Sequence, residues 1–289
     1  MTESSSLAPE QVGVLGGGRM GAGIAHAFLL AGARVAVVER DTDAADAAAV
    51  RVLESVDASI ARGTALESVE EYRERFTTGT DAALFAPCAL VVEAVPEDLA
   101  LKVDALRRVE EQIAPDAAIA SNTSSISIDE LAAVLDDPSR FVGMHFFNPV
   151  PASTLVEIVR GASTAPSLVD SARGWVAALG KTPIVVADAP GFASSRLGVA
   201  IGLEAIRMLE EGVASAEDID AAMTLGYKHP VGPLRLTDIV GLDVRLGIAE
   251  YLAAHLGARF EPPALLRRLV AEGHLGRKSG RGFYEWDAS

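Results

Sequence analysis

Several features that define secreted, metal-binding or membrane proteins are missing from this sequence. It contains one cysteine, Cys88, so no internal disulfide can form, and no group of Cys and His residues has metal-ligand spacing. No apolar run reaches the roughly 18 residues that a membrane helix needs. Residues 1–6 lack the basic and apolar segments of a signal peptide. We therefore expect a cytoplasmic protein without a resident metal ion.

Positive charge is also scarce. The formal net charge is −15, from 25 Lys and Arg against 40 Asp and Glu. This balance disfavours a broad surface for nucleic acid or for an anionic membrane, so any phosphate group must be bound locally by backbone. Hydrophobic residues make up 49% of the 289 positions, which is enough to fill the core of one large or two medium domains.

Short β-branched runs alternate with alanine-rich stretches through the first two-thirds of the chain, which predicts a mostly parallel sheet covered by helices. The predicted strands are 11–15, 34–39, 89–95, 117–121, 141–146, 155–160 and 183–188. Beyond a turn-like segment at 188–191 the pattern is helical. The predicted helices there are 194–211, 215–223, 236–256 and 263–272. We expect an α/β N-terminal domain over residues 1–189 and an all-α C-terminal domain over residues 190–289.

A glycine-rich segment follows the first predicted strand. Gly16, Gly18 and Gly21 form the pattern G-x-G-x-x-G, which permits a tight turn, close approach of backbone N–H groups to a pyrophosphate, and close helix packing. Glycine-rich turns also arise for packing alone. However, the second predicted strand ends at Glu39, about 20 residues on, where a carboxylate binds an adenosine ribose and repels a 2′-phosphate. These residues predict NAD rather than NADP, with Arg40 as an alternative partner for a 2′-phosphate.

One histidine and one glutamate stand in separate apolar strands. His145 lies in the predicted strand 141–146 and Glu157 in the predicted strand 155–160. A lone histidine is often only a core residue, but an unpaired carboxylate in an apolar strand is costly, so we predict that the two side chains pair. The carboxylate would fix the imidazole tautomer and raise its basicity. A general base needs this when a proton leaves an alcohol while hydride leaves the same carbon.

Small polar residues follow the predicted strand 117–121. The segment Ser121-Asn122-Thr123-Ser124-Ser125 would lie at the carboxyl edge of a parallel sheet, where ligands of doubly wound folds bind. Helix capping by Ser125 or Ser127 explains part of this cluster but not all five residues.

Together these motifs resemble the 3-hydroxyacyl-CoA dehydrogenase family, from about residue 10 to residue 286. The matching segments, in chain order, are 16–25, 92–97, 121–125, 145–149, 190–192, 229–234 and 276–284. The resemblance implies a Rossmann-type domain followed by a helical domain that forms a homodimer, with substrate between the two domains. It also implies NAD as the cofactor and the L isomer of a 3-hydroxyacyl-CoA as the substrate.

The same resemblance implies roles for individual residues. His145 is the catalytic base, Glu157 orients it, and Ser124 positions the substrate oxygen near the nicotinamide. Ser55 and Arg62 match positions that contact CoA or its pantetheine arm, although an exposed helix face also explains both. The positions that match cofactor contacts are Glu97, Lys102, Asn122, Asn148 and Lys278.

One residue of the expected catalytic set departs from the family pattern. Ser195 stands where the family usually has an asparagine that helps to hold the acyl carbonyl. A serine still donates a hydrogen bond but is shorter, so either a water bridges the gap or the substrate sits differently. The small residues around Ser195 could also widen the pocket for a polar or branched acyl group.

Four functions are compatible with these residues. The leading hypothesis is a dehydrogenase of fatty or short-chain 3-hydroxyacyl-CoA. The alternatives are a dehydrogenase of a hydroxyacyl group on an acyl carrier protein, a gulonate-type dehydrogenase, and an NAD-binding protein without turnover. The segment 145–148 resembles the acyl-CoA branch more than the gulonate branch. The joint presence of Ser124, His145 and Glu157 argues against loss of turnover.

Overall fold

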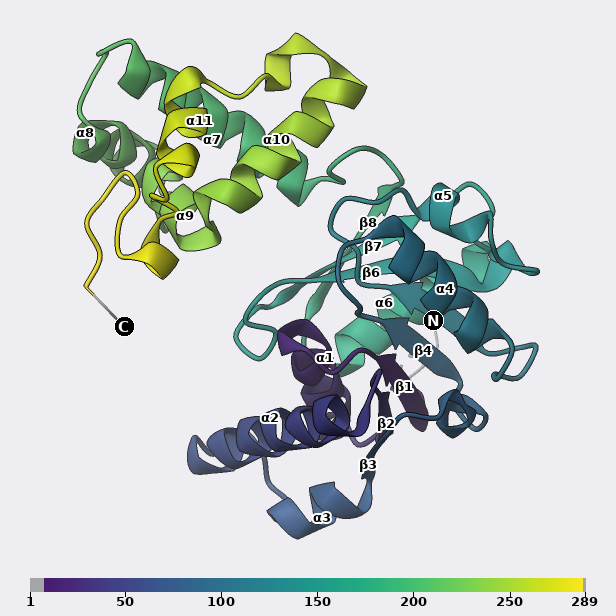
Figure 1. The fold of residues 1–289 in the computed structure, drawn as a ribbon. Coiled ribbons are helices and arrows are strands. Elements are labelled where there is room, and N and C mark those ends of the chain that lie inside the picture. The colour runs from purple at the N-terminus through teal and green to yellow at the C-terminus, as the bar shows by residue number, and fades with distance from the viewer. Residues whose placement is uncertain (1–7, 288–289) are drawn as a thin grey trace, which may run out of the picture. The chain divides into compact units, whose positions relative to one another are not determined.

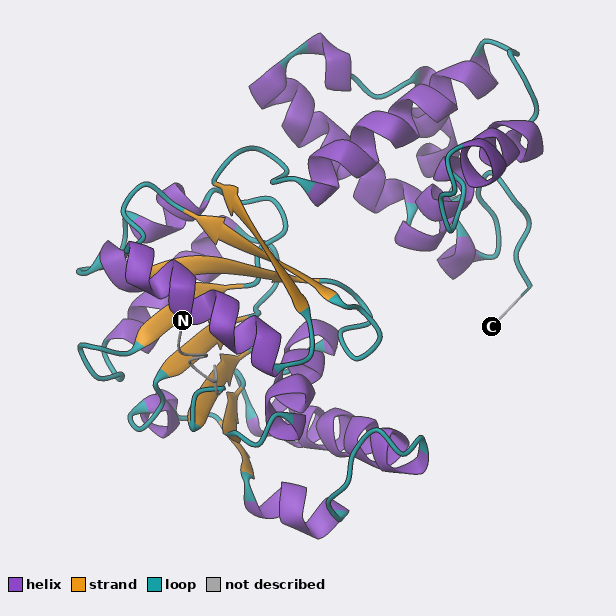
Figure 2. Cartoon of the chain, turned by 180° about the vertical axis from the view of Figure 1, so that it is seen from behind, coloured by secondary structure: helices purple, strands orange, loops and turns teal. Residues whose placement is uncertain are grey.

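The computed structural model describes residues 8–287, and the chain divides after Asp188 into two compact units. Figure 1 labels the elements of both units, and Figure 2 shows that the strands all belong to the first. The predicted fold class is confirmed: an α/β unit with a mostly parallel sheet precedes an all-α unit. No helix among the described residues is long and apolar enough to cross a membrane.

An eight-stranded sheet forms the centre of the first unit, in the order β3-β2-β1-β4-β5-β6-β7-β8. Its strands are β1 (Gln11–Leu15), β2 (Arg34–Val38), β3 (Phe76–Gly79), β4 (Leu90–Glu93), β5 (Ala118–Ser121), β6 (Phe141–Phe146), β7 (Leu155–Arg160) and β8 (Thr182–Ala187). Neighbouring strands run parallel except at the β6–β7 pair. The sequence does not predict β3, because its four residues are too few to show a period and are only partly buried.

Helices cover both faces of this sheet, which is why its central strands are apolar on both sides. Helices α1 (Arg19–Leu30), α2 (Thr42–Ala61) and α6 (Pro166–Ala178) share one core with alternate residues of the strands. Helix α5 (Ile128–Ala132) lies on the opposite face. A Cβ built on Gly143 would project from that face and meet the Ile128 side chain. Helix α4 (Leu99–Glu110) contacts α5 (Figure 1). The remaining helical segments of this unit are α3 (Val69–Glu74) and the 3-10 turns 82–85 and 138–140.

The second unit consists of helices around a separate apolar core. They are α7 (Ser194–Glu210), α8 (Ala216–Ala221) with a π-helical turn (Ala222–Gly226), α9 (Pro233–Val240), α10 (Leu242–Leu256), α11 (Ala264–Ala271) and the 3-10 turns 258–260 and 277–279. The prediction of one helix over 236–256 is wrong. Gly241 has φ 109°, outside the helical range, and separates α9 from α10. Ser215 caps α8 by accepting a hydrogen bond from the Asp218 N–H.

Two buried carboxylates fasten residues 283–286 to these helices. Asp238, on α9, is 0% exposed and accepts hydrogen bonds from the Phe283 N–H (2.9 Å), the Tyr284 N–H (2.9 Å) and the Trp286 indole N–H (2.7 Å). Asp220, on α8, accepts from the Tyr284 hydroxyl at 2.9 Å and caps the start of α9. A segment without helix or strand is thereby part of the core.

The Asp238→Ala substitution tests this attachment. It leaves two backbone N–H groups and one indole N–H without an acceptor, and each buried unsatisfied donor costs roughly 1–3 kcal/mol. We expect the free energy of unfolding of the helical unit to fall by about 3 kcal/mol or more in urea, followed by tryptophan fluorescence. The exposed Glu211→Ala variant is the control. Equal unfolding midpoints for the two variants would contradict the assignment.

Candidate active site

The carboxyl ends of parallel strands bring the predicted site residues of the first unit to one edge of the sheet. Strands β1, β4, β5 and β6 run parallel and end at Leu15, Glu93, Ser121 and Phe146. Ligands of open α/β sheets bind at this edge, because the loops there face solvent while helix N-termini point towards it.

The glycine-rich loop leaves β1 in a conformation that requires glycine. Gly16 has φ 95°, and a Cβ on Gly21 would lie 1.7 Å from the Gly16 carbonyl oxygen, so the turn and the start of α1 tolerate no side chain there. Gly18 is different, because a Cβ built on it meets nothing within 4 Å. Packing within the protein does not require glycine at position 18, whereas close approach of a pyrophosphate does.

Glu39 faces this loop from the end of β2. Its Oε1 accepts a hydrogen bond from the Gly17 N–H at 2.7 Å, and a carboxylate retains further lone pairs for ribose hydroxyls. The guanidinium of Arg40 forms an ion pair with Asp41 at 2.9 Å and is largely exposed. The loop and Glu39 together fit an adenine dinucleotide.

His145 and Glu157 form the predicted pair. They are direct partners across the antiparallel β6–β7 ladder, and His145 Nδ1 lies 2.8 Å from Glu157 Oε2. Glu157 is 0% exposed and His145 is buried. A carboxylate only accepts hydrogen bonds, so Nδ1 is the donor and Nε2 is the nitrogen that can exchange a proton. The Phe147 ring packs against the imidazole, with centroids 4.5 Å apart.

A second buried ionic cluster lies at the end of β4. Glu93 is 0% exposed and Lys102, on α4, is 1% exposed. Lys102 Nζ lies 2.8 Å from Glu93 Oε1 and 3.2 Å from the Val95 carbonyl oxygen, and 3.3 Å from Glu97 Oε2. The Ser121 hydroxyl donates to Glu93 Oε2 at 2.5 Å. The ammonium group thus has three acceptors for its three N–H donors.

Glu97 extends this cluster to the predicted substrate-positioning serine. Its Oε1 accepts hydrogen bonds from the Thr123 hydroxyl (2.7 Å), and from the backbone N–H groups of Ser124 (2.9 Å) and Ser125 (3.0 Å). Burial alone would raise the pKa of Glu97. The nearby Lys102 charge and the hydrogen bonds from Thr123, Ser124 and Ser125 outweigh burial and lower that pKa. Glu97 therefore holds the loop that carries Ser124 in place, and Lys102 pairs with Glu97.

Asn122 and Asn148 lie on neighbouring loops of the same edge. Asn122 Oδ1 accepts a hydrogen bond from the Phe146 N–H at 2.9 Å, which ties the end of β5 to the end of β6. Asn148 is exposed and precedes Pro149 through a cis peptide bond.

Ser55 and Arg62 lie on or just after α2, away from the strand ends. The Ser55 hydroxyl donates to the Arg51 carbonyl of its own helix at 2.9 Å. Arg62 donates to the Ser59 hydroxyl at 3.2 Å, and Ser59 in turn bonds to the buried His26. Burial, followed by the positive charges of Arg62 and Lys181, lowers the pKa of His26 to about 4.

Two predicted site residues belong to the helical unit. Ser195 lies in the first turn of α7, and the Lys278 ammonium is 2.6 Å from Asp243 at the start of α10. Within residues 8–287, no cluster of His, Cys, Asp and Glu side chains could hold a metal ion.

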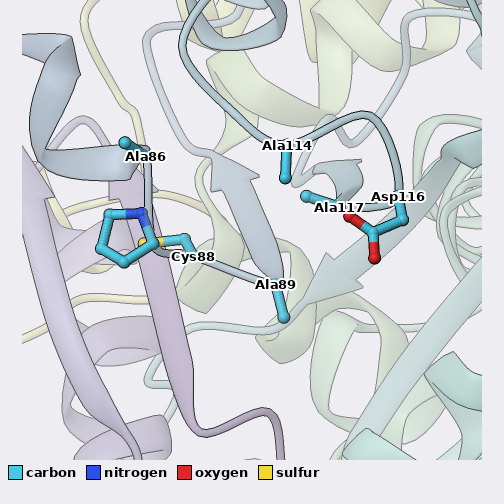
Figure 3. A pocket seen from close by; sticks show the side chains of 7 residues that line it. Ala86, Cys88, Ala89, Ala114, Asp116 and Ala117 are labelled. Atoms are coloured by element: carbon cyan, nitrogen blue, oxygen red, sulfur yellow. The ribbon is translucent and has the colours of Figure 1, made fainter.

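A pocket lies at the amino ends of β4 and β5, opposite to the carboxyl ends that hold the site residues. Figure 3 shows its lining residues. It is lined by four alanines, Pro87, Cys88 and Asp116. Burial raises the pKa of the Cys88 thiol to about 11, so the cysteine stays protonated and unreactive. This pocket brings no chemistry to the active-site edge.

Glu93 was not predicted as a site residue, although its sequence context carries a signal. Glu93 ends the apolar strand Leu90–Glu93, where an unpaired carboxylate is as costly as at Glu157. Its partner was harder to identify, because Lys102 lies in a helix whose orientation is set by tertiary packing.

The lowered pKa of Glu97 predicts a pH dependence of stability. A carboxyl whose pKa is lowered by folding stabilises the folded state above its ordinary value of about 4.5, and this contribution is lost as pH falls through the lowered value. Glu97→Gln should therefore be destabilising at neutral pH, and its difference from wild type should shrink in acid. Urea unfolding of the variant and of wild type at neutral and at acidic pH measures this difference in stability. The exposed Glu54→Gln variant is the control. A difference that does not change with pH would contradict the prediction.

Comparisons with known proteins agree with this geometry. Residues 11–189 match the NAD-binding domain of 3-hydroxyacyl-CoA dehydrogenase, and residues 191–286 match its C-terminal domain. The chain is 41% identical to a probable 3-hydroxybutyryl-CoA dehydrogenase of Deinococcus radiodurans over 95% of this chain and 99% of that protein. It is 41% identical to the 3-hydroxybutyryl-CoA dehydrogenase of Mycobacterium tuberculosis over 97% and 100% of the two chains.

Solved structures agree with these sequence matches. The crystal structure of (S)-3-hydroxybutyryl-CoA dehydrogenase from Ralstonia eutropha superposes with a TM-score of 0.92 at 39% identity, over 97% of this chain and 100% of that one. Both domain matches and both full-length relatives lead to one conclusion. The chain belongs to the 3-hydroxyacyl-CoA dehydrogenase family.

Proposed function

We propose that this protein oxidises the 3-hydroxyl of an L-3-hydroxyacyl-CoA with NAD, and that His145 is the base. The observation that carries this proposal is the buried His145–Glu157 pair, at 2.8 Å, on the sheet edge that also holds the Ser124 loop. The full-length similarity to 3-hydroxybutyryl-CoA dehydrogenases supports a short acyl chain.

The reaction breaks one O–H bond and one C–H bond of the substrate. The proton and the hydride pass to two different acceptors. The substrate hydroxyl proton passes to His145 Nε2, while Glu157 holds Nδ1 and stabilises the charge that develops on the ring. The 3-carbon becomes a ketone as its hydride leaves, and NAD when bound supplies the hydride acceptor. The Ser124 hydroxyl donates to Glu97 Oε1 at 3.2 Å in the structure without substrate. With substrate bound, it would turn this hydrogen to the substrate oxygen, while the Ser124 N–H stays bonded to Glu97. Ser195 would hold the thioester carbonyl in place of the usual asparagine.

The cofactor would be held by residues at the same edge. Gly16, Gly18 and Gly21 shape the loop for the pyrophosphate, and Glu39 accepts the ribose hydroxyls. We extend this assignment to the other residues that the family resemblance implies, namely Glu97, Lys102, Asn122, Asn148 and Lys278. Ser55 and Arg62 would contact the CoA portion of the substrate.

A homodimer formed by the helical unit is part of this proposal. Several large apolar side chains of that unit are more than half exposed: Leu197, Val213, Leu225 and Tyr227. Exposed apolar surface of this kind is typical of a subunit interface. A hydroxyacyl group on an acyl carrier protein remains the alternative substrate, and turnover of matched CoA-linked and carrier-linked substrates separates the two.

Replacing the base tests the proposed chemistry. His145→Gln keeps a hydrogen-bonding side chain but cannot accept the proton, and general-base catalysis contributes about 10²- to 10⁴-fold. We expect kcat for L-3-hydroxybutyryl-CoA, followed as NADH absorbance, to fall by that factor while NAD binding measured by calorimetry is retained. The exposed His255→Gln variant should behave as wild type. Full activity of His145→Gln would refute the role of base.

Replacing Glu39 tests the cofactor assignment separately. Glu39→Ser removes the negative charge that repels a 2′-phosphate and shortens the group that accepts the ribose hydroxyls. We expect kcat/KM with NAD to fall about tenfold or more and the NAD-over-NADP preference to narrow, with Glu54→Ser on α2 as control. An unchanged preference would mean that Glu39 does not contact the ribose.

A further inference from the structure

Arg245 is a buried charge that neither the proposed mechanism nor the attachment of residues 283–286 uses. It lies on α10, is 8% exposed, and has no hydrogen bond or ion pair with another described residue. Its Nε is inaccessible to solvent and has no acceptor. Burial lowers the pKa of the guanidinium, and no carboxylate compensates for that burial. Other buried charges of the chain, such as Lys102 and Glu157, have bonded partners.

The position of the guanidinium depends on a glycine of the neighbouring helix. A Cβ on Gly198, in α7, would lie 3.1 Å from Arg245 Nη1, 3.6 Å from Nη2 and 3.8 Å from Cζ. The planar group therefore lies against bare backbone, and a side chain at position 198 would crowd it. A buried arginine that is positioned in this way but has no acid to neutralise it is complementary to an anion from outside the chain.

The guanidinium also lies within one helical turn of Ser195. Ser195 and Gly198 are three residues apart on α7, so the two positions share one side of the helix, with roughly 5–6 Å between their Cβ positions. Ser195 is the residue that the proposed function places at the thioester carbonyl. An acyl chain that begins there and follows α7 reaches Arg245 after about five carbon–carbon bonds of about 1.5 Å each.

We propose that Arg245 binds a carboxylate at the far end of the acyl chain, so that the preferred substrate is the CoA thioester of a 3-hydroxydicarboxylic acid. This inference rests on the proposed function and specifies its substrate class. A guanidinium presents two parallel N–H donors to a carboxylate, and the low solvent access around Arg245 strengthens that interaction.

The test compares two substrates that differ only in the terminal group: the CoA thioesters of L-3-hydroxyhexanedioic acid and L-3-hydroxyhexanoic acid. A charged hydrogen bond contributes enough for about a 10- to 100-fold preference in kcat/KM. We expect wild type to prefer the dioic substrate by that factor. Arg245→Met should abolish the preference by slowing only the dioic substrate, and Arg245→Lys should retain part of it. Arg268→Met, on an exposed turn of α11, is the matched control.

The outcomes separate this inference from the proposed function. No turnover by wild type of either substrate or of L-3-hydroxybutyryl-CoA means that the proposed function itself fails, whereas turnover of L-3-hydroxybutyryl-CoA alone overturns only the dicarboxylic substrate class. Turnover of both substrates with no preference for the dioic one leaves the function standing and overturns the role of Arg245. An equal loss for both substrates in Arg245→Met would assign the arginine to a CoA or NAD phosphate instead. A change in oligomeric state on size exclusion, or a lower melting temperature, would assign it to an interface or to the core, and each result overturns the inference.

Discussion

The ion pair between Glu93 and Lys102 is the interaction on which the active-site edge depends. Both side chains are removed from solvent, so neither charge is tolerated without the other, and loss of one partner of such a pair typically costs about 3–5 kcal/mol. The pair joins the end of β4 to α4, and through Ser121 it reaches the end of β5. Through Glu97 the same ammonium group also stabilises the loop that carries Ser124.

The β6–β7 reversal makes an equally specific contribution. In the antiparallel ladder His145 and Glu157 are direct partners, and side chains of such partners project from the same face of the sheet. A shift of one residue in register would turn Glu157 to the other face and leave the histidine opposite an apolar side chain. Apolar neighbours on both strands hold this register, so the packing of the core determines the geometry of the base.

Much of this arrangement was predictable from sequence because its signals are local. The β-branched runs and the glycine pattern indicate strand, turn and helix without tertiary information, and they locate seven of the eight strands of the described sheet. The cost of burying Glu157 and the cost of a side chain at Gly21 can also be inferred from neighbouring residues in the sequence.

What the sequence did not reveal depends on packing between distant elements. The break at Gly241 was hidden by apolar residues on both sides, so that two helices looked like one. Arg245 was not singled out, because an arginine in a helix is usually solvated, and its burial follows from the approach of α7 at Gly198. Glu97 is similar: five donors converge on it from a loop whose path is set by the sheet.

The attachment of residues 283–286 to Asp238 and Asp220 has a consequence for biosynthesis. Those two carboxylates lie on α8 and α9, which leave the ribosome well before Tyr284 and Trp286 do. Until then Asp238 lacks its three N–H donors and Asp220 lacks the Tyr284 hydroxyl. The first unit, whose sheet closes with β8 (Thr182–Ala187), can acquire its native contacts while synthesis continues. The helical unit must wait for residue 286, so the two halves of one enzyme mature at different times.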